Sequence, residues 1–95
     1  MYYAVYTWTI SQLSKCYPDI TSDEDLYYVL KSVIDRDMTG VANYGEYVAE
    51  FNDIDMARAF IKNVLFYGKA SKGVSAPDYA AILDIDEHHW IELWT

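Results

Sequence analysis

The chain has 95 residues, 53% of them hydrophobic, and this size and composition predict one globular domain over residues 1–95. Its net charge of −8 excludes binding to DNA, RNA or an anionic membrane through a basic surface, because those phosphates would repel it. A single cysteine excludes an internal disulfide. With no signal peptide and no apolar run of about 18 residues, we expect a cytoplasmic protein.

Two elements are predicted in the first third of the chain. Tyr2 to Trp8 is dense in aromatic and β-branched residues, which predicts a central strand with apolar side chains on both faces. Thr21 and Glu24 then have the spacing of a capping box, and apolar residues at intervals of three and four predict an amphipathic helix that ends near Asp37. These apolar residues are Leu26, Val29, Leu30, Val33 and Ile34.

The segment from Asp35 to Glu46, DRDMTGVANYGE, has the ligand spacing of an EF-hand calcium loop. Gly40 stands at the sixth position, where the loop turns and a positive φ favours glycine. Together with the residues up to Phe51, the segment resembles an EF-hand loop that enters its second helix, and this resemblance implies a bound Ca²⁺. The ligands would be Asp35, Asp37, Thr39, the Val41 carbonyl, Asn43 and Glu46.

The same segment has a second interpretation. Thr39 replaces the usual aspartate, asparagine or serine of the fifth position, Ala42 replaces a branched apolar residue, and the sequence shows no second loop. In this alternative the helix ends, the chain turns at Gly40, and a strand begins between Val41 and Tyr47.

A strand and a helix are predicted in the middle of the chain. The alternation of residues 47–51 favours a strand over the second helix of an EF-hand. Asn52 or Asp53 then caps a helix with Arg58 and Lys62 on its polar side and Gly68 at its C′ position. The apolar stripe of this helix consists of Ala57, Phe60, Ile61, Val64 and Leu65.

The last part of the chain allows two interpretations. Residues 69–77 have no apolar periodicity and predict a mobile loop. Residues 76–85 form either a short helix capped by Ser75 with Asp78, or a strand that leads into a hairpin at residues 86–88. His89 to Trp94 predicts a strand. Its alternation would place Trp90, Glu92 and Trp94 on one face.

The order of these elements predicts an α+β fold. We expect a two-layer sandwich, in which two helices cover one face of a three- or four-stranded antiparallel or mixed sheet. Residues 46–61, EYVAEFNDIDMARAFI, resemble the strand-to-helix segment of RNA-recognition domains, and this resemblance implies a ferredoxin-like arrangement or a variant of it. RNA binding does not follow. The RNA-binding motif requires a basic residue and two aromatic residues at three positions that are occupied here by Tyr44, Glu46 and Val48.

The sequence contains no recognisable catalytic constellation. His88 and His89 are adjacent, so a strand would direct their imidazoles to opposite faces and away from a common metal ion. Nothing near Cys16 in the sequence would lower the pKa of its thiol, and Val74 stands where a phosphate-binding loop requires lysine. We therefore expect no enzymatic activity and no catalytic residue.

Acidic residues are concentrated between Asp19 and Asp55. This block has ten acidic and two basic residues, so it alone carries a net charge of −8. The chain also has ten tyrosines and three tryptophans, and aromatic anchors beside acids are typical of protein interfaces. We expect a basic protein surface to bind at Asp19, Asp23, Glu24, Asp25, Tyr28, Asp35, Asp37, Tyr44, Glu46 and Glu50.

In composition the chain resembles the small acidic anti-defence proteins of phages and mobile elements, including anti-CRISPR and anti-restriction DNA mimics. This resemblance implies an inhibitory or regulatory protein that acts in the host cytoplasm. Its carboxylates would replace phosphates on the basic surface of a nucleic-acid-binding protein or nuclease. Two alternatives stay open, a calcium-binding module with a single EF-hand-like loop and an immunity protein or antitoxin.

Overall fold

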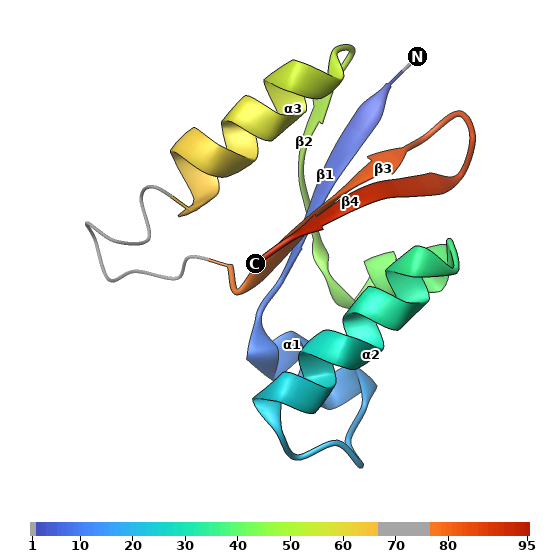
Figure 1. The fold of residues 1–95 in the computed structure, drawn as a ribbon, viewed down its shortest axis with the longest axis vertical. Helices are drawn as coiled ribbons and strands as arrows, with labels where there is room; N and C mark the ends of the chain where they lie inside the picture. Colours follow the sequence, from blue (N-terminus) through green and yellow to red (C-terminus); the bar gives the residue numbers. More distant parts are fainter. Residues whose placement is uncertain (1, 67–76) are drawn as a thin grey trace.

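A four-stranded antiparallel sheet forms the centre of the molecule (Figure 1). The computed structural model describes residues 2–66 and 77–95. The strands are β1 (Tyr3–Trp8), β2 (Glu46–Phe51), β3 (Tyr79–Asp84) and β4 (His89–Trp94), and they lie in the order β2-β1-β3-β4. The predicted α+β class is confirmed, and β1 is a central strand as its sequence indicates.

Helices pack on both faces of this sheet. On one face lie α1 (Ile10–Cys16), α2 (Asp23–Asp35) and the 3₁₀ helix η1 (Thr39–Tyr44); on the other lie α3 (Ile54–Phe60) and its continuation, the π-helix η2 (Ile61–Phe66) (Figure 1). The sheet with α1 and α2 is consistent with the predicted two-layer sandwich, but the two predicted helices, α2 and α3, pack on opposite faces of the sheet and not on one face. No helix of the described residues is long and apolar enough to cross a membrane.

The alternation of side chains along β1 divides the core into two parts. Ala4 and Trp8 face α1 and α2, whereas Val5 faces α3, and all three are fully buried. β3 is buried along its whole length, with Leu83 on the side of α1 and α2 and Ile82 on the side of α3. The antiparallel pairing of residues 79–84 with β1 and β4 shows that they form a strand, not the alternative helix.

Two helix starts differ from the sequence-based prediction. α1 has no counterpart among the predicted elements. It begins with a capping box, in which Thr9 Oγ1 accepts from Gln12 N at 3.1 Å and Gln12 Oε1 accepts from Thr9 N at 2.8 Å. The predicted cap at Thr21 is wrong, because Ser22 is the N-cap of α2 and its hydroxyl accepts a backbone N–H of the first turn at 3.4 Å.

α3 begins at a predicted cap and differs from the prediction at its end. Asp53 is the N-cap, and its Oδ1 accepts two backbone N–H groups of the first turn at 2.7 and 3.3 Å. Val64, predicted in the apolar stripe, is 57% exposed, because the wider turn of η2 brings Leu65 and Phe66 to the core instead. The predicted C′ residue Gly68 and residues 69–76 of the predicted loop lie outside the described residues.

A β-bulge in β4 changes which aromatic side chains share a face. Consecutive residues of β3 pair with Glu92 and Trp90, which leaves Ile91 as the extra residue. Trp90 therefore packs on the side of α1 and α2, whereas Trp94 packs on the side of α3. The prediction that Trp90, Glu92 and Trp94 share one face is wrong because the bulge interrupts the alternation.

The chain order of the elements differs from the ferredoxin-like order β-α-β-β-α-β. Helices separate β1 from β2 and β2 from β3, and β3 and β4 form a hairpin. In the sheet, β2 and β4 are the two edge strands.

Candidate functional site

The EF-hand-like segment is divided among three elements. Asp35 is the last residue of α2, residues 39–44 form η1, and Glu46 is the first residue of β2. The predicted turn with a positive φ at Gly40 is wrong, because Gly40 lies within the 3₁₀ helix and Asp37 has the left-handed backbone, with φ of 56°. Aspartate tolerates this conformation better than most residues because its short polar side chain forms local hydrogen bonds.

The carboxylates of this segment contact different partners. Asp35 Oδ2 lies 3.0 Å from Lys31 Nζ on the exposed side of α2. Asp37 Oδ1 lies 2.9 Å from His89 Nδ1 and accepts a hydrogen bond from Trp90 N at 2.9 Å. Across residues 2–66 and 77–95, no group of three or more His, Cys, Asp or Glu side chains is placed to hold a metal ion. Calcium binding by Asp35, Asp37, Thr39, Asn43 and Glu46 stays a prediction.

Asp37 connects the end of α2 to the start of β4. The hydrogen bonds from His89 and from the backbone of Trp90 hold the pKa of Asp37 below its usual range. Asp37 and Trp90 are 53 positions apart in the sequence. Sequence periodicity gives no signal for such a contact, so this structural function of Asp37 was not predicted.

A group of exposed acids surrounds the start of α2. Asp19 lies in the α1–α2 connection, and Asp23, Glu24 and Asp25 form the first turn of the helix. All four are exposed, and none forms an ion pair with another described residue. Tyr28, one turn after Glu24, is 56% exposed. These five residues are called the acidic patch below.

Tyr28 is the exposed end of a row of three tyrosines. Its ring centroid lies 5.3 Å from that of Tyr27, which lies 5.9 Å from that of Tyr79 in β3. Burial, with Asp78 and Asp23 nearby, raises the pKa of Tyr79. The row connects the surface of α2 to the core and limits the orientations that Tyr28 can adopt.

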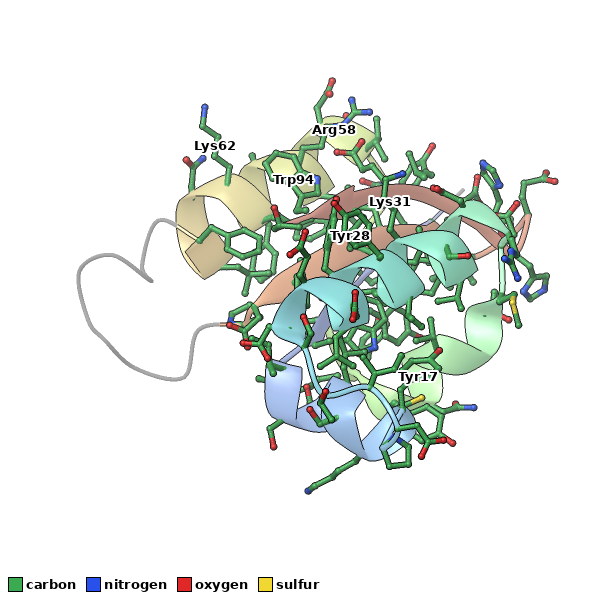
Figure 2. The ribbon with its side chains drawn as sticks, turned by 60° about the horizontal axis from the view of Figure 1, so that its bottom comes forward. Tyr17, Tyr28, Lys31, Arg58, Lys62 and Trp94 are labelled. Atoms are coloured by element: carbon green, nitrogen blue, oxygen red, sulfur yellow. The ribbon has the colours of Figure 1, made fainter. Side chains whose placement is uncertain are left out.

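Two basic side chains of the described residues are paired with acids outside the patch. Arg58 Nε lies 2.8 Å from Glu92 Oε1, and Arg58 Nη1 lies 3.3 Å from Asp55 Oδ1. The hydrogen bond to Glu92 is the main reason that the pKa of Arg58 is raised. Lys31 lies on the same helix as Tyr28, but its ammonium group is paired with Asp35 and not with an acid of the patch (Figure 2). The negative charge of the patch is therefore not neutralised by these cations.

The other predicted contact residues lie apart from the patch. Asp35 and Asp37 lie at the opposite end of α2. Tyr44 is the last residue of η1 and is 50% exposed, and Glu46 begins the edge strand β2. In the same strand Glu50 accepts a hydrogen bond from the Tyr47 hydroxyl at 3.0 Å. The structure thus brings together five of the ten predicted residues, all within the acidic patch.

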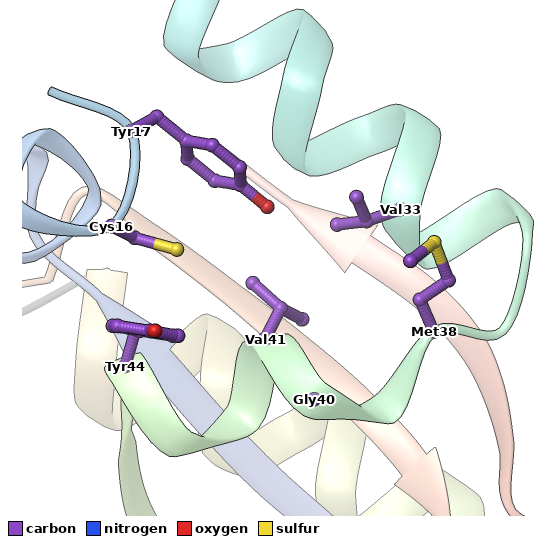
Figure 3. A pocket seen from close by; sticks show the side chains of 7 residues that line it. All are labelled: Cys16, Tyr17, Val33, Met38, Gly40, Val41 and Tyr44. Atoms are coloured by element: carbon purple, nitrogen blue, oxygen red, sulfur yellow. The ribbon is translucent and has the colours of Figure 1, made fainter. Parts of the chain in front are cut away.

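A cavity of about 240 Å³ opens between α1, α2 and η1 (Figure 3). Its walls include Cys16 at the end of α1 and Tyr17 directly after it, Val33 of α2, Met38 directly before η1 and Tyr44 at the end of η1. Burial and the neighbouring Cys16 raise the pKa of Tyr17. The sequence did not predict this site, because its residues come from three elements and share no periodicity.

No protein family, curated protein or solved structure matches the chain.

Proposed function

We propose that this chain is a small acidic inhibitory or regulatory protein that occupies the basic, nucleic-acid-binding surface of a partner protein, in the manner of anti-CRISPR and anti-restriction inhibitors. The acidic patch is the observation that supports the proposal. Its four carboxylates are exposed, close in the sequence and not paired with any cation of the described residues. A basic partner supplies the charge that the chain itself does not provide.

The chemistry of such a contact follows from the residue types. Lysine and arginine side chains that bind phosphates also bind carboxylates, so the patch competes with nucleic acid for them. Attraction between opposite net charges increases the rate of encounter, while desolvation of the charged groups limits the gain in affinity. Tyr28 adds an aromatic contact whose orientation is restricted by Tyr27.

The acids of the first turn also stabilise α2 itself. Asp23, Glu24 and Asp25 lie at the positive end of the helix dipole, where each acidic side chain contributes about 0.3–1 kcal/mol. Helix stabilisation does not require Asp19, which lies outside the helix, or the exposed Tyr28. An experiment on the patch must therefore separate binding from helix stability.

A double substitution with a matched control makes this separation. Asp23→Asn/Glu24→Gln removes two charges from the patch, and Asp55→Asn/Glu87→Gln removes two charges elsewhere. Asp55 lies in the first turn of α3, so the control also loses a helix–dipole interaction. Each protein is immobilised on a resin and incubated with host lysate at about 0.05 M NaCl. We expect the native chain and the control to retain a nucleic-acid-binding partner that the patch variant does not retain.

Competition with nucleic acid completes the test. Duplex DNA, or the partner's own RNA, should displace the retained protein, and about 0.2 M NaCl should weaken its retention. Retention that is equal in both variants, or unaffected by nucleic acid, would contradict the proposal. A single small toxin held regardless of nucleic acid would favour the immunity-protein alternative.

A further inference from the structure

Hydrogen bonds from two tryptophan side chains fix one wall of the cavity between α1, α2 and η1. Trp8 Nε1 donates to Val41 O at 3.0 Å and Trp90 Nε1 donates to Met38 O at 3.1 Å, so two indoles hold η1 in place. Met38 N also donates to Val33 O at 2.9 Å, which joins η1 to the end of α2. These contacts fix the wall formed by Met38 and Val41. A ligand that enters the cavity would not need to reorganise η1.

The size and lining of the cavity favour one apolar side chain as its occupant. A volume of about 240 Å³ is smaller than the roughly 300–1,000 Å³ typical of small-molecule sites. None of the described residues that line it is charged; the lining consists of valine, methionine, cysteine, glycine and two tyrosines. A charged side chain would lose its hydration there without gaining an ionic partner.

The acidic patch is close enough to act together with this cavity. Asp25, Val29 and Val33 are spaced four residues apart along α2, so they follow one ridge of the helix. The step of eight positions from Asp25 to Val33 corresponds to about 12 Å along the axis. An extended peptide covers this distance in about four residues. On the α1 side, Asp19 follows the cavity residue Tyr17 by two positions.

We propose that the cavity binds one phenylalanine-sized apolar side chain from a lysine- or arginine-rich segment of the partner, while the patch binds the basic residues about four positions away. The inference rests on the proposed function and adds the chemistry of the partner's segment. Charge complementarity selects a basic segment, and the uncharged lining selects the apolar side chain within it. The contact is thus an apolar anchor beside an ionic one.

A designed peptide tests this arrangement. The probe has a single phenylalanine with a pair of arginines four residues away on each side, and the comparison peptide has alanine in place of the phenylalanine. Affinity is measured by fluorescence anisotropy, and the rate of Cys16 alkylation by iodoacetamide reports on the cavity. Cys16 is the only cysteine of the chain, so this signal has one source. We expect the phenylalanine peptide to bind about 30-fold more tightly than the alanine peptide and to slow alkylation.

Gly40 offers a position at which a larger side chain can be introduced beside the cavity. A Cβ added at Gly40 would meet nothing within 4 Å, and the residue lines the cavity. Gly40→Phe should abolish the difference between the two peptides and the protection of Cys16. Gly40→Ala, the matched control, should behave as the native chain. Circular dichroism verifies that both variants are folded.

The outcomes separate the two proposals. Equal affinity of the two peptides for the native chain, or no protection of Cys16, overturns the cavity proposal alone if binding still requires Asp23 and Glu24. If Asp23→Asn/Glu24→Gln binds the phenylalanine peptide as tightly as the native chain, the patch proposal is overturned and the cavity proposal stands. If neither peptide binds, both are overturned.

Discussion

Gly45 lies where η1 meets β2, and there is no space for a side chain at this position. A Cβ would lie 2.6 Å from Trp8 Nε1 and 2.7 Å from the Thr7 carbonyl oxygen. The indole cannot shift freely, because Trp8 is fully buried and donates its N–H to Val41 O. We expect Gly45→Ala to lower the free energy of unfolding by about 1–3 kcal/mol, measured by urea denaturation.

Gly40 provides the control for this steric argument. It lies in η1, only a few residues earlier, and an added Cβ meets nothing within 4 Å. Gly40→Ala should therefore change the free energy of unfolding by no more than about 0.5 kcal/mol. Equal losses for the two substitutions would show that contact with Trp8 is not the cause.

Asp37 makes stability depend on pH in the acidic range. Its folded-state pKa is lowered, first by His89 and then by the backbone of Trp90, so it contributes stability above the unfolded-state pKa. This contribution is lost as the pH falls through the folded-state pKa. Asp37→Asn keeps a residue that tolerates φ of 56° but removes the charge. The native chain should be more stable than this variant at pH 6, and the difference should disappear in acid.

Urea unfolding of both proteins between about pH 2 and 6 measures this effect, because carboxyl groups titrate in that range. The other acids are common to both proteins, so the difference isolates Asp37. A difference in stability that stays constant over the whole range would mean that the charge of Asp37 contributes nothing.

Elements with uninterrupted local signals were predictable from the sequence. The signals for β2, β1 and the cap at Asp53 each occupy a few neighbouring positions, and all three features are present in the structure. The alternation predicted within β2 is interrupted, because a β-bulge at Val48 places Val48, Ala49 and Phe51 on the same side of the sheet. The acids of the patch are also neighbours, so their grouping could be inferred before the fold. In these cases the residues that decide the structure lie within the element itself.

The remaining features depend on residues far apart in the chain. The β-bulge at Ile91 depends on the pairing of β4 with β3. The wider turn of η2 depends on the packing of Leu65 and Phe66 against the core. The cavity requires three elements to meet, and Asp37 meets β4 across 53 positions. The short α1 was missed for another reason, since its seven residues contain too few apolar positions to establish a helical period.

The start of α1 is stabilised by Thr9 and the start of α2 by Ser22. Thr9→Ala removes the hydroxyl that accepts from Gln12 N and should cost about 0.5–2 kcal/mol of stability. Thr21→Ala should have almost no effect, because Thr21 does not cap α2. Thermal unfolding of the two variants tests the assignment. A larger loss for Thr21→Ala would place the start of α2 one residue earlier.

On the scale of the whole molecule, like charges oppose the compact state. The net charge is −8, and the four acids of the patch lie within seven residues without a described cationic partner. By contrast, Asp55 and Glu92 lie within 3.3 Å and 2.8 Å of Arg58. Electrostatic repulsion between carboxylates should therefore be concentrated at the patch. The carboxylates that a basic partner would bind thus destabilise the free protein.

Salt should then stabilise the free protein while it weakens binding. Between about 0.01 and 0.1 M NaCl the Debye length falls from about 30 to 10 Å, which screens repulsion among Asp19, Asp23, Glu24 and Asp25. The melting temperature of the native chain should rise over this range, and that of Asp23→Asn/Glu24→Gln should rise less. The control Asp55→Asn/Glu87→Gln should respond as the native chain does, because Asp55 is already paired with Arg58. If the two variants respond equally, the repulsion belongs to the total charge and not to the patch.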